Sequence, residues 1–508
     1  RELNGQLVQV IHPEPQAKLR VKYLAKQASP QARQAQKEKL IEKTIRAPFD
    51  LANDPLLRLA LIRDSQPKSA IKKSSKPQGQ PARPRNSDTL VITLHHTLAD
   101  QWSMQVFFQE LFTIYRSYLQ GQEPDLPDLP IQYKDYADWE QSEANQKRLQ
   151  KQKKYWQKRL GQNPPVTELP LDHARPSVFA YDKGYTSAHL DRQTIDALRS
   201  LAHEHDASLF MVLLAAFKLY LSRLTGKDDI ITGTSAANRS QLELDRLIGY
   251  FGNDIPVRAR LKPGQTFQQF FRDFRQTIMN DLQNSEYPLE KIVDDMHPSR
   301  QARHIRLFNA DFKINENRSD RPSPQDYFQN HNINSGMANH QAAGNDWGLI
   351  VEVFADQTRL SSEFNAQVLK EATVSSWTAD LKHLLAQIAQ DPGKKLGEYE
   401  AVSPETRKTI LHKFNQTYRS HPRDKAPHQF FEAQARKTPQ KTAAVHQDQT
   451  ITYQKLDQAA NRLAHCLKAN NIKNQDVLAL DIHPDNYLEI PQLILASHKI
   501  GAACLILD

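Results

Sequence analysis

The sequence predicts an α/β fold of two lobes of similar size, followed by the opening of a second α/β domain. Short runs rich in β-branched residues alternate twice with helical patterns of period 3.6 between residues 1 and 392. After Asp391-Pro392-Gly393 the pattern breaks, and a new series of short strands and helices begins. A hydrophobic content of 39% in 508 residues is enough for packed cores in roughly two to four domains.

The first lobe is predicted to mix strands with charged helices. We expect strands at 6–11, 57–63 and 89–94, and helices at 32–46, 102–120 and 139–160. The strands at 57–63 and 89–94 are expected to pair antiparallel, and the polar 139–160 helix to lie across the surface. Prolines at positions 164, 165, 170 and 176 then interrupt the pattern. They divide the predicted lobes into residues 1–165 and 177–392.

The second lobe repeats this mixture. We expect helices at 209–224, from 266 onward and at 374–388, with strands at 229–234, 255–261, 306–314, 349–354 and 359–364. One face of the helix that begins near Thr266 carries a row of apolar side chains: Phe267, Phe270, Phe271, Phe274, Ile278 and Leu282. Such a stripe is typical of a helix that faces a core, not of a cofactor site.

The last part of the chain is predicted to be a linker at 393–425, with a helix at 404–414, and the start of a new domain at 426–508. In that domain we expect helices at 428–435, 456–469 and 487–498, and strands at 442–445, 450–453, 477–480 and 503–506. These elements begin an α/β domain whose remaining core we expect to lie beyond residue 508.

Composition and charge exclude several classes of protein. The net charge is +9, but much of the excess lies in residues 65–87, which are rich in Ser, Pro and Gln and hold no acid. We interpret this stretch as a solvated insertion and not a nucleic-acid-binding arm, and expect a second long loop at 316–346. Two cysteines, Cys466 and Cys504, argue against a disulfide scaffold or a thiolate metal site and fit a reducing cytoplasm. No apolar run reaches the roughly 18 residues of a membrane span.

A pair of histidines follows the predicted strand at 89–94. His95 and His96 come directly after it, and Asp100 lies just before the predicted helix at 102–120. Imidazole is the side chain best suited to steer a proton near neutral pH. Transfer of an acyl group from a thioester to an amine needs this help, because the attacking nitrogen must lose a proton. The alternative is that these are ordinary packed or surface histidines.

The histidine segment and five later segments resemble a known family. His95-His96-Thr97-Leu98-Ala99-Asp100 resembles the HHxxxDG motif of condensation domains in non-ribosomal peptide synthetases. Further resemblances to the same family lie at 127–136, 155–156, 169–172, 248–253 and 287–293. Residues 451–464 and 497–508 then resemble the beginning of an adenylation domain, of the AMP-dependent synthetase and ligase family.

The resemblance implies a chloramphenicol-acetyltransferase-like fold with two lobes and a tunnel through it. Donor and acceptor carrier proteins would present phosphopantetheine thioesters, and the rest of the adenylation domain would be a further partner. It implies that His96 is the catalytic histidine and that His95 and Asp100 support it. Arg239 is the candidate partner of Asp100, which could also cap the following helix. No cofactor or metal bound by this chain is implied, and amino-acid activation is not expected from it.

The sequence departs from the family pattern next to the histidines. Gln101 stands where the motif has glycine, and adds bulk beside the expected reaction centre. We expect Gln101, Trp102, Ser103 and Asn253 to line the tunnel. An adenylation-like region that follows directly favours a condensation domain over an epimerisation domain, and the paired histidines favour it over a heterocyclisation domain.

Three functions remain open from the sequence. The first is an active condensation domain that uses His96. The second, favoured by Gln101, is an impaired condensation-like scaffold that only holds neighbouring modules. The third is a freestanding acyltransferase with the HHxxxD motif, against which the adenylation-like region argues.

Overall fold

The computed structural model describes residues 2–3, 6–25, 29–63, 88–176, 182–296, 307–316, 345–354, 357–420, 422–482 and 486–507. The predicted insertion at 65–87 and nearly all of the predicted loop at 316–346 lie outside these residues. The chain forms two compact units, Arg1–Thr409 and Ile410–Asp508.

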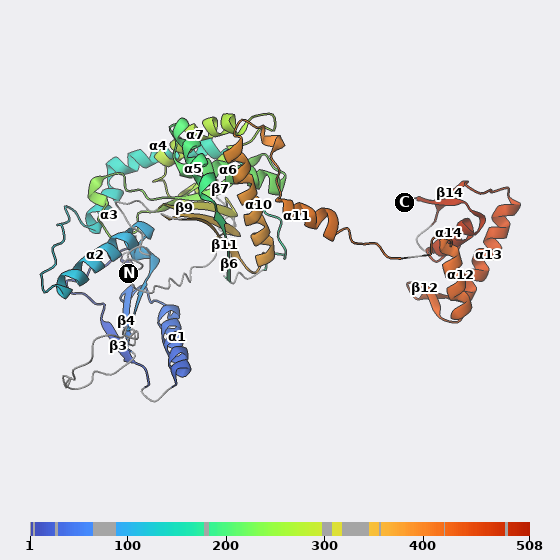
Figure 1. Ribbon diagram of the computed structural model, residues 1–508, viewed down its shortest axis with the longest axis horizontal. Helices are drawn as coiled ribbons and strands as arrows, with labels where there is room; N and C mark the ends of the chain where they lie inside the picture. Colours follow the sequence, from blue (N-terminus) through green and yellow to red (C-terminus); the bar gives the residue numbers. More distant parts are fainter. Residues whose placement is uncertain are drawn as a thin grey trace, which may run out of the picture. The chain divides into compact units, whose positions relative to one another are not determined.

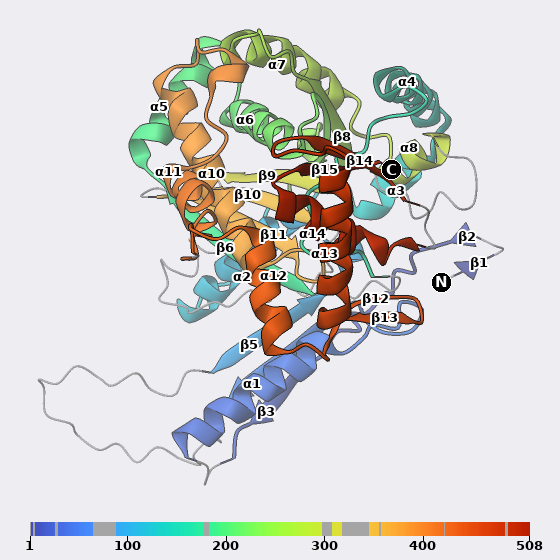
Figure 2. The same cartoon turned by 90° about the vertical axis from the view of Figure 1, so that its right-hand side faces the viewer.

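A three-stranded sheet organises the first part of the larger unit. β3 (Leu19–Tyr23) lies parallel to β4 (Leu57–Arg63), and β4 pairs antiparallel with β5 (Thr89–Leu94) as predicted. The helix α1 (Pro30–Arg46) lies along this sheet (Figure 2) and buries Ala60, Ile62 and Val91. The predicted strand at 6–11 was wrong beyond residue 7, because the structure has only a short hairpin of β1 (Glu2–Leu3) and β2 (Gln6–Leu7) there.

Three helices connect this sheet to the second one. They are α2 (Gln101–Leu119), α3 (Tyr133–Gln141) and α4 (Glu143–Leu160). The single helix predicted at 139–160 was wrong, because Ser142 leaves the helical backbone and its hydroxyl caps α4 by accepting from the Asn145 amide. Nor does α4 only lie on the surface, since Trp156 and Leu160 are fully buried and Trp156 donates to the Asn284 carbonyl.

A six-stranded sheet in the order β6-β11-β10-β9-β7-β8 forms the centre of the second part. Its strands are β6 (Lys183–Leu190), β7 (Asp229–Ala236), β8 (Asn253–Arg260), β9 (Ala310–Glu316), β10 (Trp347–Val353) and β11 (Thr358–Asn365). β9 pairs parallel with β10, while the β6–β11, β10–β11 and β7–β8 pairs are antiparallel. The sequence pattern predicted neither β6 nor the helix that follows it, α5 (Arg192–Glu204).

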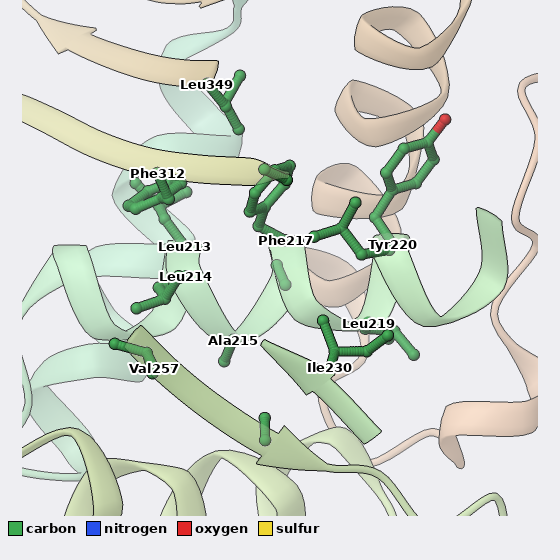
Figure 3. Close-up of a cluster of buried hydrophobic side chains, with 14 of the residues drawn as sticks. Leu213, Leu214, Ala215, Phe217, Leu219, Tyr220, Ile230, Val257, Phe312 and Leu349 are labelled. Carbon is green, nitrogen blue, oxygen red and sulfur yellow. The ribbon is translucent and has the colours of Figure 1, made fainter. Parts of the chain in front are cut away.

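The helices α6 (Leu209–Thr225), α7 (Phe267–Gln283) and α10 (Glu371–Gln390) pack with this sheet (Figure 1), α5 packs against α6 and α10, and α8 (Leu289–Met296) follows α7. Figure 3 shows Phe217 of α6 beside Phe312 of β9 in the core, and their ring centroids are 5.8 Å apart. The phenylalanine stripe of α7 is buried as predicted, and Leu282 packs against it. Apolar burial of this extent is the main source of stability in such a domain.

The predicted linker at 393–425 divides into two parts in the structure. Leu396 and Tyr399 belong to the core of the larger unit, and the Leu396 amide donates to the Gln265 carbonyl at 2.8 Å. The predicted helix at 404–414 is an α-helical turn, α11 (Pro404–Lys408), continued by a π-helical turn at Thr409–Lys413. The linker therefore has its packed half before residue 409 and its exposed half after it.

The smaller unit contains the elements predicted for a new α/β domain. They are α12 (Pro427–Lys437), β12 (Thr442–His446), β13 (Gln449–Thr452), α13 (Tyr453–Ala469), β14 (Val477–Asp481), α14 (Glu489–Ile500) and β15 (Ala503–Leu507). The helices α12, α13 and α14 pack together (Figure 1), and Lys499 of α14 joins Glu432 and Asp457 on the other two. β14 and β15 pair parallel, which is the pairing expected of an α/β domain.

Candidate active site

The two histidines lie in the loop between β5 and α2. β5 ends at Leu94, the His95 amide donates to the Leu56 carbonyl at 2.9 Å, and a single 3₁₀ turn, His96–Leu98, follows. The chain then enters α2 at Gln101. A strand on one side and a capped helix on the other therefore fix both ends of this short loop.

The His96 side chain is exposed, and one of its two ring nitrogens has a defined partner. Its Nδ1 lies 2.9 Å from the Ala99 carbonyl oxygen. A carbonyl only accepts hydrogen bonds, so Nδ1 carries the proton and the neutral ring keeps its lone pair on Nε2. The ring of Tyr250 packs edge-on against His96 with centroids 5.2 Å apart. These two contacts orient the ring and leave Nε2 as its basic atom.

The ring of His95 has a different set of neighbours. Its Nδ1 accepts from the Thr97 amide at 3.3 Å and lies 2.9 Å from the Thr97 hydroxyl. The ring edge packs on Phe49, with centroids 5.8 Å apart. His95 therefore ties the loop to its own turn and to the segment before β4, which fits a supporting position.

Asp100 is buried and accepts hydrogen bonds from two separate segments. Its Oδ1 caps α2 through the Ser103 amide at 2.8 Å, and its Oδ2 accepts from the Phe251 amide at 3.1 Å. Arg239 lies 3.2 Å from the same carboxylate, so the ion pair and the helix cap are both present. The Asp100 amide also donates to the Gly249 carbonyl at 3.3 Å. This one residue joins the histidine loop to residues 249–251 and to Arg239.

Arg239 is held by more than its carboxylate. Its Nη1 donates to the carbonyls of Leu244 and Leu247, and its guanidinium lies 4.2 Å from the centroid of the Phe251 ring. Burial lowers the pKa of Arg239, and Asp100 opposes that change. The ring contact, the two carbonyls and Asp100 therefore compensate in part for the removal of this cation from water, while its Nε is buried without a hydrogen-bond partner among the described residues.

The four side chains expected to line a tunnel have different environments. The Ser103 side chain is fully buried, and its hydroxyl donates to the Gly249 carbonyl at 2.6 Å. The hydroxyl also accepts from Arg239 at 2.8 Å, so Ser103 holds residue 249 and Arg239, and its place in the lining of a tunnel stays a prediction. Gln101, in contrast, is exposed, and its Nε2 donates to Asn315 of β9 at 2.7 Å.

Trp102 and Asn253 are partly buried and hold neighbouring loops. The Trp102 indole donates to the Asp245 carbonyl at 2.9 Å. The Asn253 amide nitrogen donates to the carbonyls of Ser285 and Tyr287, at 2.7 and 2.9 Å, and its oxygen accepts from the Leu289 amide. The polar atoms of Asn253 are thus used to fix the segment before α8.

Tyr250 is a site residue that sequence reasoning missed. It belongs to the segment at 248–253, and that motif was the signal that could have drawn attention to it. Burial, and then Asp254 and Glu290, raise the pKa of Tyr250, so its phenol stays protonated near neutral pH. A neutral phenol beside His96 can exchange hydrogen bonds with a substrate without adding charge.

The described residues contain neither a cluster of metal ligands nor a single helix that could span a membrane. No group of three or more metal-ligating side chains occurs among them. No single helix in the described ranges is long and apolar enough to cross a membrane, although α5 and α6 pass such a test as a pair bent by 107°.

Comparison with known protein families identifies the family of this chain. The Condensation domain family matches residues 82–411, which include the histidine loop, Arg239 and the six-stranded sheet. This chain belongs to the condensation domain family. The AMP-binding enzyme family matches residues 431–508, so the condensation domain is followed by the start of an adenylation domain.

The curated relatives are peptide synthetases. The chain is 29% identical over 514 residues to one of the linear gramicidin synthase proteins of Brevibacillus parabrevis, covering 100% of this chain and 9% of the relative. It is 32% identical over 485 residues to phosphinothricin tripeptide synthetase PhsC of Streptomyces viridochromogenes, covering 94% of this chain and 42% of that protein. The condensation domain and its neighbour thus span less than half of each of these relatives.

Solved structures share the fold. A four-domain nonribosomal peptide synthetase, holo-AB3403 bound to AMP and glycine, aligns with a TM-score of 0.71 and 18% identity over 97% of this chain and 36% of its own. The condensation domain of the Monacolin K polyketide synthase MokA aligns with a TM-score of 0.57 and 17% identity over 75% of this chain and 81% of its own. At these identities the likeness establishes the fold, as the sequence predicted.

Proposed function

We propose that this condensation domain forms an amide bond between a donor acyl or peptidyl thioester and an acceptor aminoacyl thioester, each carried on the phosphopantetheine arm of a carrier protein. The observation that carries the proposal is the exposed His96 ring, whose Nδ1 is bound to the Ala99 carbonyl. Its Nε2 is therefore the atom that faces an incoming amine. Donor and acceptor carrier proteins and the remainder of the adenylation domain are the proposed partners.

The proposed reaction is a simple substitution at the thioester carbonyl. The acceptor amine forms the new C–N bond, the C–S bond breaks, and the amine proton leaves for the departing thiolate. His96 Nε2 accepts a hydrogen bond from the amine, and so orients its lone pair and can carry the proton. Asp100 and Arg239 act indirectly, because they hold the histidine loop and residues 249–251 in place around His96.

The test is a transfer assay with this chain, a donor carrier loaded with an acyl group and an acceptor carrier loaded with an amino acid. We expect the intact mass of the acceptor carrier to increase by the mass of the donor acyl group. The variant His96→Ala should slow this transfer by roughly 10²- to 10⁴-fold, the usual contribution of a positioned acid or base. His203→Ala, an exposed histidine at the end of α5, is the matched control and should transfer at the wild-type rate.

A second candidate is a scaffold that holds neighbouring modules without catalysis. The contact between Gln101 and Asn315 favours it, because a side chain stands where the family motif has a glycine. Transfer that stays absent with several acceptors, or that His96→Ala does not reduce, would support the scaffold and contradict our proposal. The freestanding acyltransferase is disfavoured by the AMP-binding match at 431–508.

A further inference from the structure

The strand β9 has one apolar and one polar face. Ala310 and Phe312 point into the core and are fully buried, as expected for alternate positions on a strand. Asp311, Lys313 and Asn315 occupy the other face, and Lys313 lies 3.7 Å from the Asp311 carboxylate. This strand of the central sheet therefore presents polar side chains on the face opposite its buried apolar residues.

Gln101 connects the histidine loop to this polar face. It is the first residue of α2, directly after Asp100, and its Nε2 donates to the Asn315 side-chain oxygen at 2.7 Å. The two residues are 214 positions apart in the chain. Neither backbone is displaced to make the contact, since Asp100 caps α2 and Asn315 stays in register with Glu352 of β10. A glycine at position 101 could not make this bond.

The contact begins beside the histidine loop, because α2 starts at Gln101 directly after that loop. Tyr250 packs on the His96 ring. Burial raises the pKa of Tyr250, and Lys313, two residues before Asn315 on the same strand face, partly opposes this change. Lys313 of the polar face of β9 is therefore near enough to Tyr250 to act on its pKa, and Tyr250 packs on the His96 ring. Gln101 reaches the same strand face from the start of α2, five residues after His96 in the chain.

We propose that the Gln101–Asn315 pair is a specificity determinant, which restricts the acceptor of this condensation domain to aminoacyl groups with a small side chain. The inference rests on the proposed function, in which His96 Nε2 contacts the acceptor amine. The carbon next to that amine carries the acceptor side chain, so groups beside His96 bound the space for it. Gln101 fills part of that space, and its hydrogen bond to Asn315 keeps it there.

The physical basis is steric exclusion by a side chain that is held in place. An unpaired glutamine on a helix surface could move aside at little cost. A glutamine bonded to Asn315 must break that bond to admit a larger group, and both amides then need new partners. Discrimination by pocket size is typically worth roughly 10- to 200-fold per extra group.

The first experiment measures binding, so that it does not depend on catalysis. Two stable acceptor analogues, glycyl-pantetheine and phenylalanyl-pantetheine with an amide in place of the thioester, are titrated onto the whole chain by calorimetry. We expect the wild-type protein to bind the glycyl analogue at least ~10-fold more tightly. Gln101→Ala and Asn315→Ala should each move this ratio toward one by strengthening binding of the phenylalanyl analogue.

Two controls separate the pair from a general effect of mutation. Asn315→Asp keeps an acceptor for the Gln101 amide and should keep the wild-type ratio. Gln109→Ala removes an exposed glutamine two turns further along α2 and should also keep it. Equal binding of the two analogues by the wild type overturns the inference, as does an unchanged ratio in Gln101→Ala. If Gln101→Ala moves the binding ratio toward one and Asn315→Ala does not, the hydrogen-bonded pair is not the determinant. The bulk of Gln101 alone then accounts for the selectivity.

The transfer assay with the same variants distinguishes this inference from the proposed function. If the domain is active, glycyl-carrier should be a better acceptor than phenylalanyl-carrier, and Gln101→Ala should reduce that preference. If no variant transfers an acyl group but the binding ratio changes as expected, the amide-forming function fails and the selective site stands. If transfer depends on His96 but the acceptor preference does not change in Gln101→Ala, the proposed function stands and the inference fails.

Discussion

The carboxylate of Asp100 is the point where three parts of the domain meet. It caps α2, accepts from the Phe251 amide and pairs with Arg239, whose side chain is 1% exposed. Removing the carboxylate leaves a buried guanidinium without its counter-charge and an uncapped helix. Both effects are costly, the first because a lone charge in a protein interior is poorly solvated.

We predict that Asp100→Ala lowers the free energy of unfolding by about 3–5 kcal/mol, the usual cost of breaking a buried ion pair. Urea denaturation followed by circular dichroism measures it. Arg199→Ala is the matched control, since Arg199 pairs with Glu316 at 3.0 Å in an exposed position, where about 1 kcal/mol or less is expected. Adding Arg239→Ala to Asp100→Ala should cost less than the sum of the single changes, and strict additivity would contradict the coupling.

At the residue scale, the sequence was sufficient to predict some site residues but not their long-range contacts. The adjacent histidines, Asp100 and Arg239 were each expected from the resemblance, because chemistry is carried by residue type and spacing. The burial of Ser103 and the partner of Gln101 were not, because both depend on segments that are distant in the chain. A serine hydroxyl binds residue 249 and a glutamine binds residue 315 only after the sheets and helices have packed.

At the scale of elements, α7 illustrates how a helix is specified by its pattern. Thr266 caps its first turn by accepting from the Gln269 amide at 3.2 Å, and its apolar face packs into the core. Phe267 and Phe271 on that face are fully buried and stacked, with centroids 6.2 Å apart. The sequence predicted this helix because every local signal agreed with the burial.

Phe271→Ala should lower the free energy of unfolding by about 3–5 kcal/mol, since it removes a ring from a packed core and leaves a cavity. Its neighbour Arg272 is exposed, and Arg272→Ala should change stability by less than about 0.5 kcal/mol. Thermal and urea unfolding of both variants measure the difference. Similar losses in the two variants would show that α7 does not pack as described.

The helix α6 carries a lysine whose charged form its apolar surroundings do not favour. Lys218 is fully buried, and its Nζ donates to the carbonyls of Val257 and Ile230 at 2.5 and 3.4 Å. Burial lowers the pKa of Lys218 well below its ordinary value of 10.5. Between these two pKa values the unfolded chain binds a proton that the folded protein does not, so the free energy of unfolding increases with pH.

We therefore predict that the wild-type protein gains stability as the pH rises toward the ordinary lysine pKa of 10.5, by up to about 1.4 kcal/mol per pH unit from this group. Lys218→Met should remove this gain, so its stability relative to the wild type falls as pH rises. Urea midpoints at pH 7, 8, 9 and 10 measure the trend. Lys262→Met replaces an exposed lysine and should follow the wild-type pH profile. Parallel profiles for the wild type and Lys218→Met would disprove the proposed titration.

Other elements show where sequence patterns were insufficient. β6 was not predicted because its sequence holds a single β-branched residue, Thr186, whereas α5 has a cap at Asp191 and a buried apolar face that sequence reasoning overlooked. The break between α3 and α4 was missed because the sequence on both sides of Ser142 is typical of a polar helix. Only the cap that Ser142 provides marks the start of a second helix.

At the scale of the whole molecule, the chain divides into two compact units between Thr409 and Ile410. The stretch before that point is anchored, since the Phe267 amide donates to the Lys394 carbonyl and Ser403 donates to Asp380. The stretch after it is exposed at each described position from 411 to 426. The first residues of the predicted linker are therefore packed onto the larger unit, and the linker at 393–425 and the lobe boundary at 165–177 stay predictions.

We expect limited trypsin digestion to cut at Arg419, Arg423 or Lys425 before it cuts at Lys394, Lys395 or Arg407. Backbone groups bound in turns and strand bridges resist proteolysis, whereas exposed chain does not. Mass spectrometry of the fragments over time gives the order of cleavage. Early cleavage at Lys394 or Lys395 would contradict the packing of residues 394–399 onto the larger unit.

The sequence by itself determined the α/β class, most helices and strands, the histidine loop and the family, because these depend on local periodicity and on short motifs. The tertiary structure alone decided which side chains near His96 are exposed and which are used as supports. Burial and long-range hydrogen bonds belong to pairs of segments that one-dimensional spacing cannot bring together. Gln101 shows the difference: its identity was a departure from a motif in the sequence, and its contact with Asn315 exists only in the folded domain.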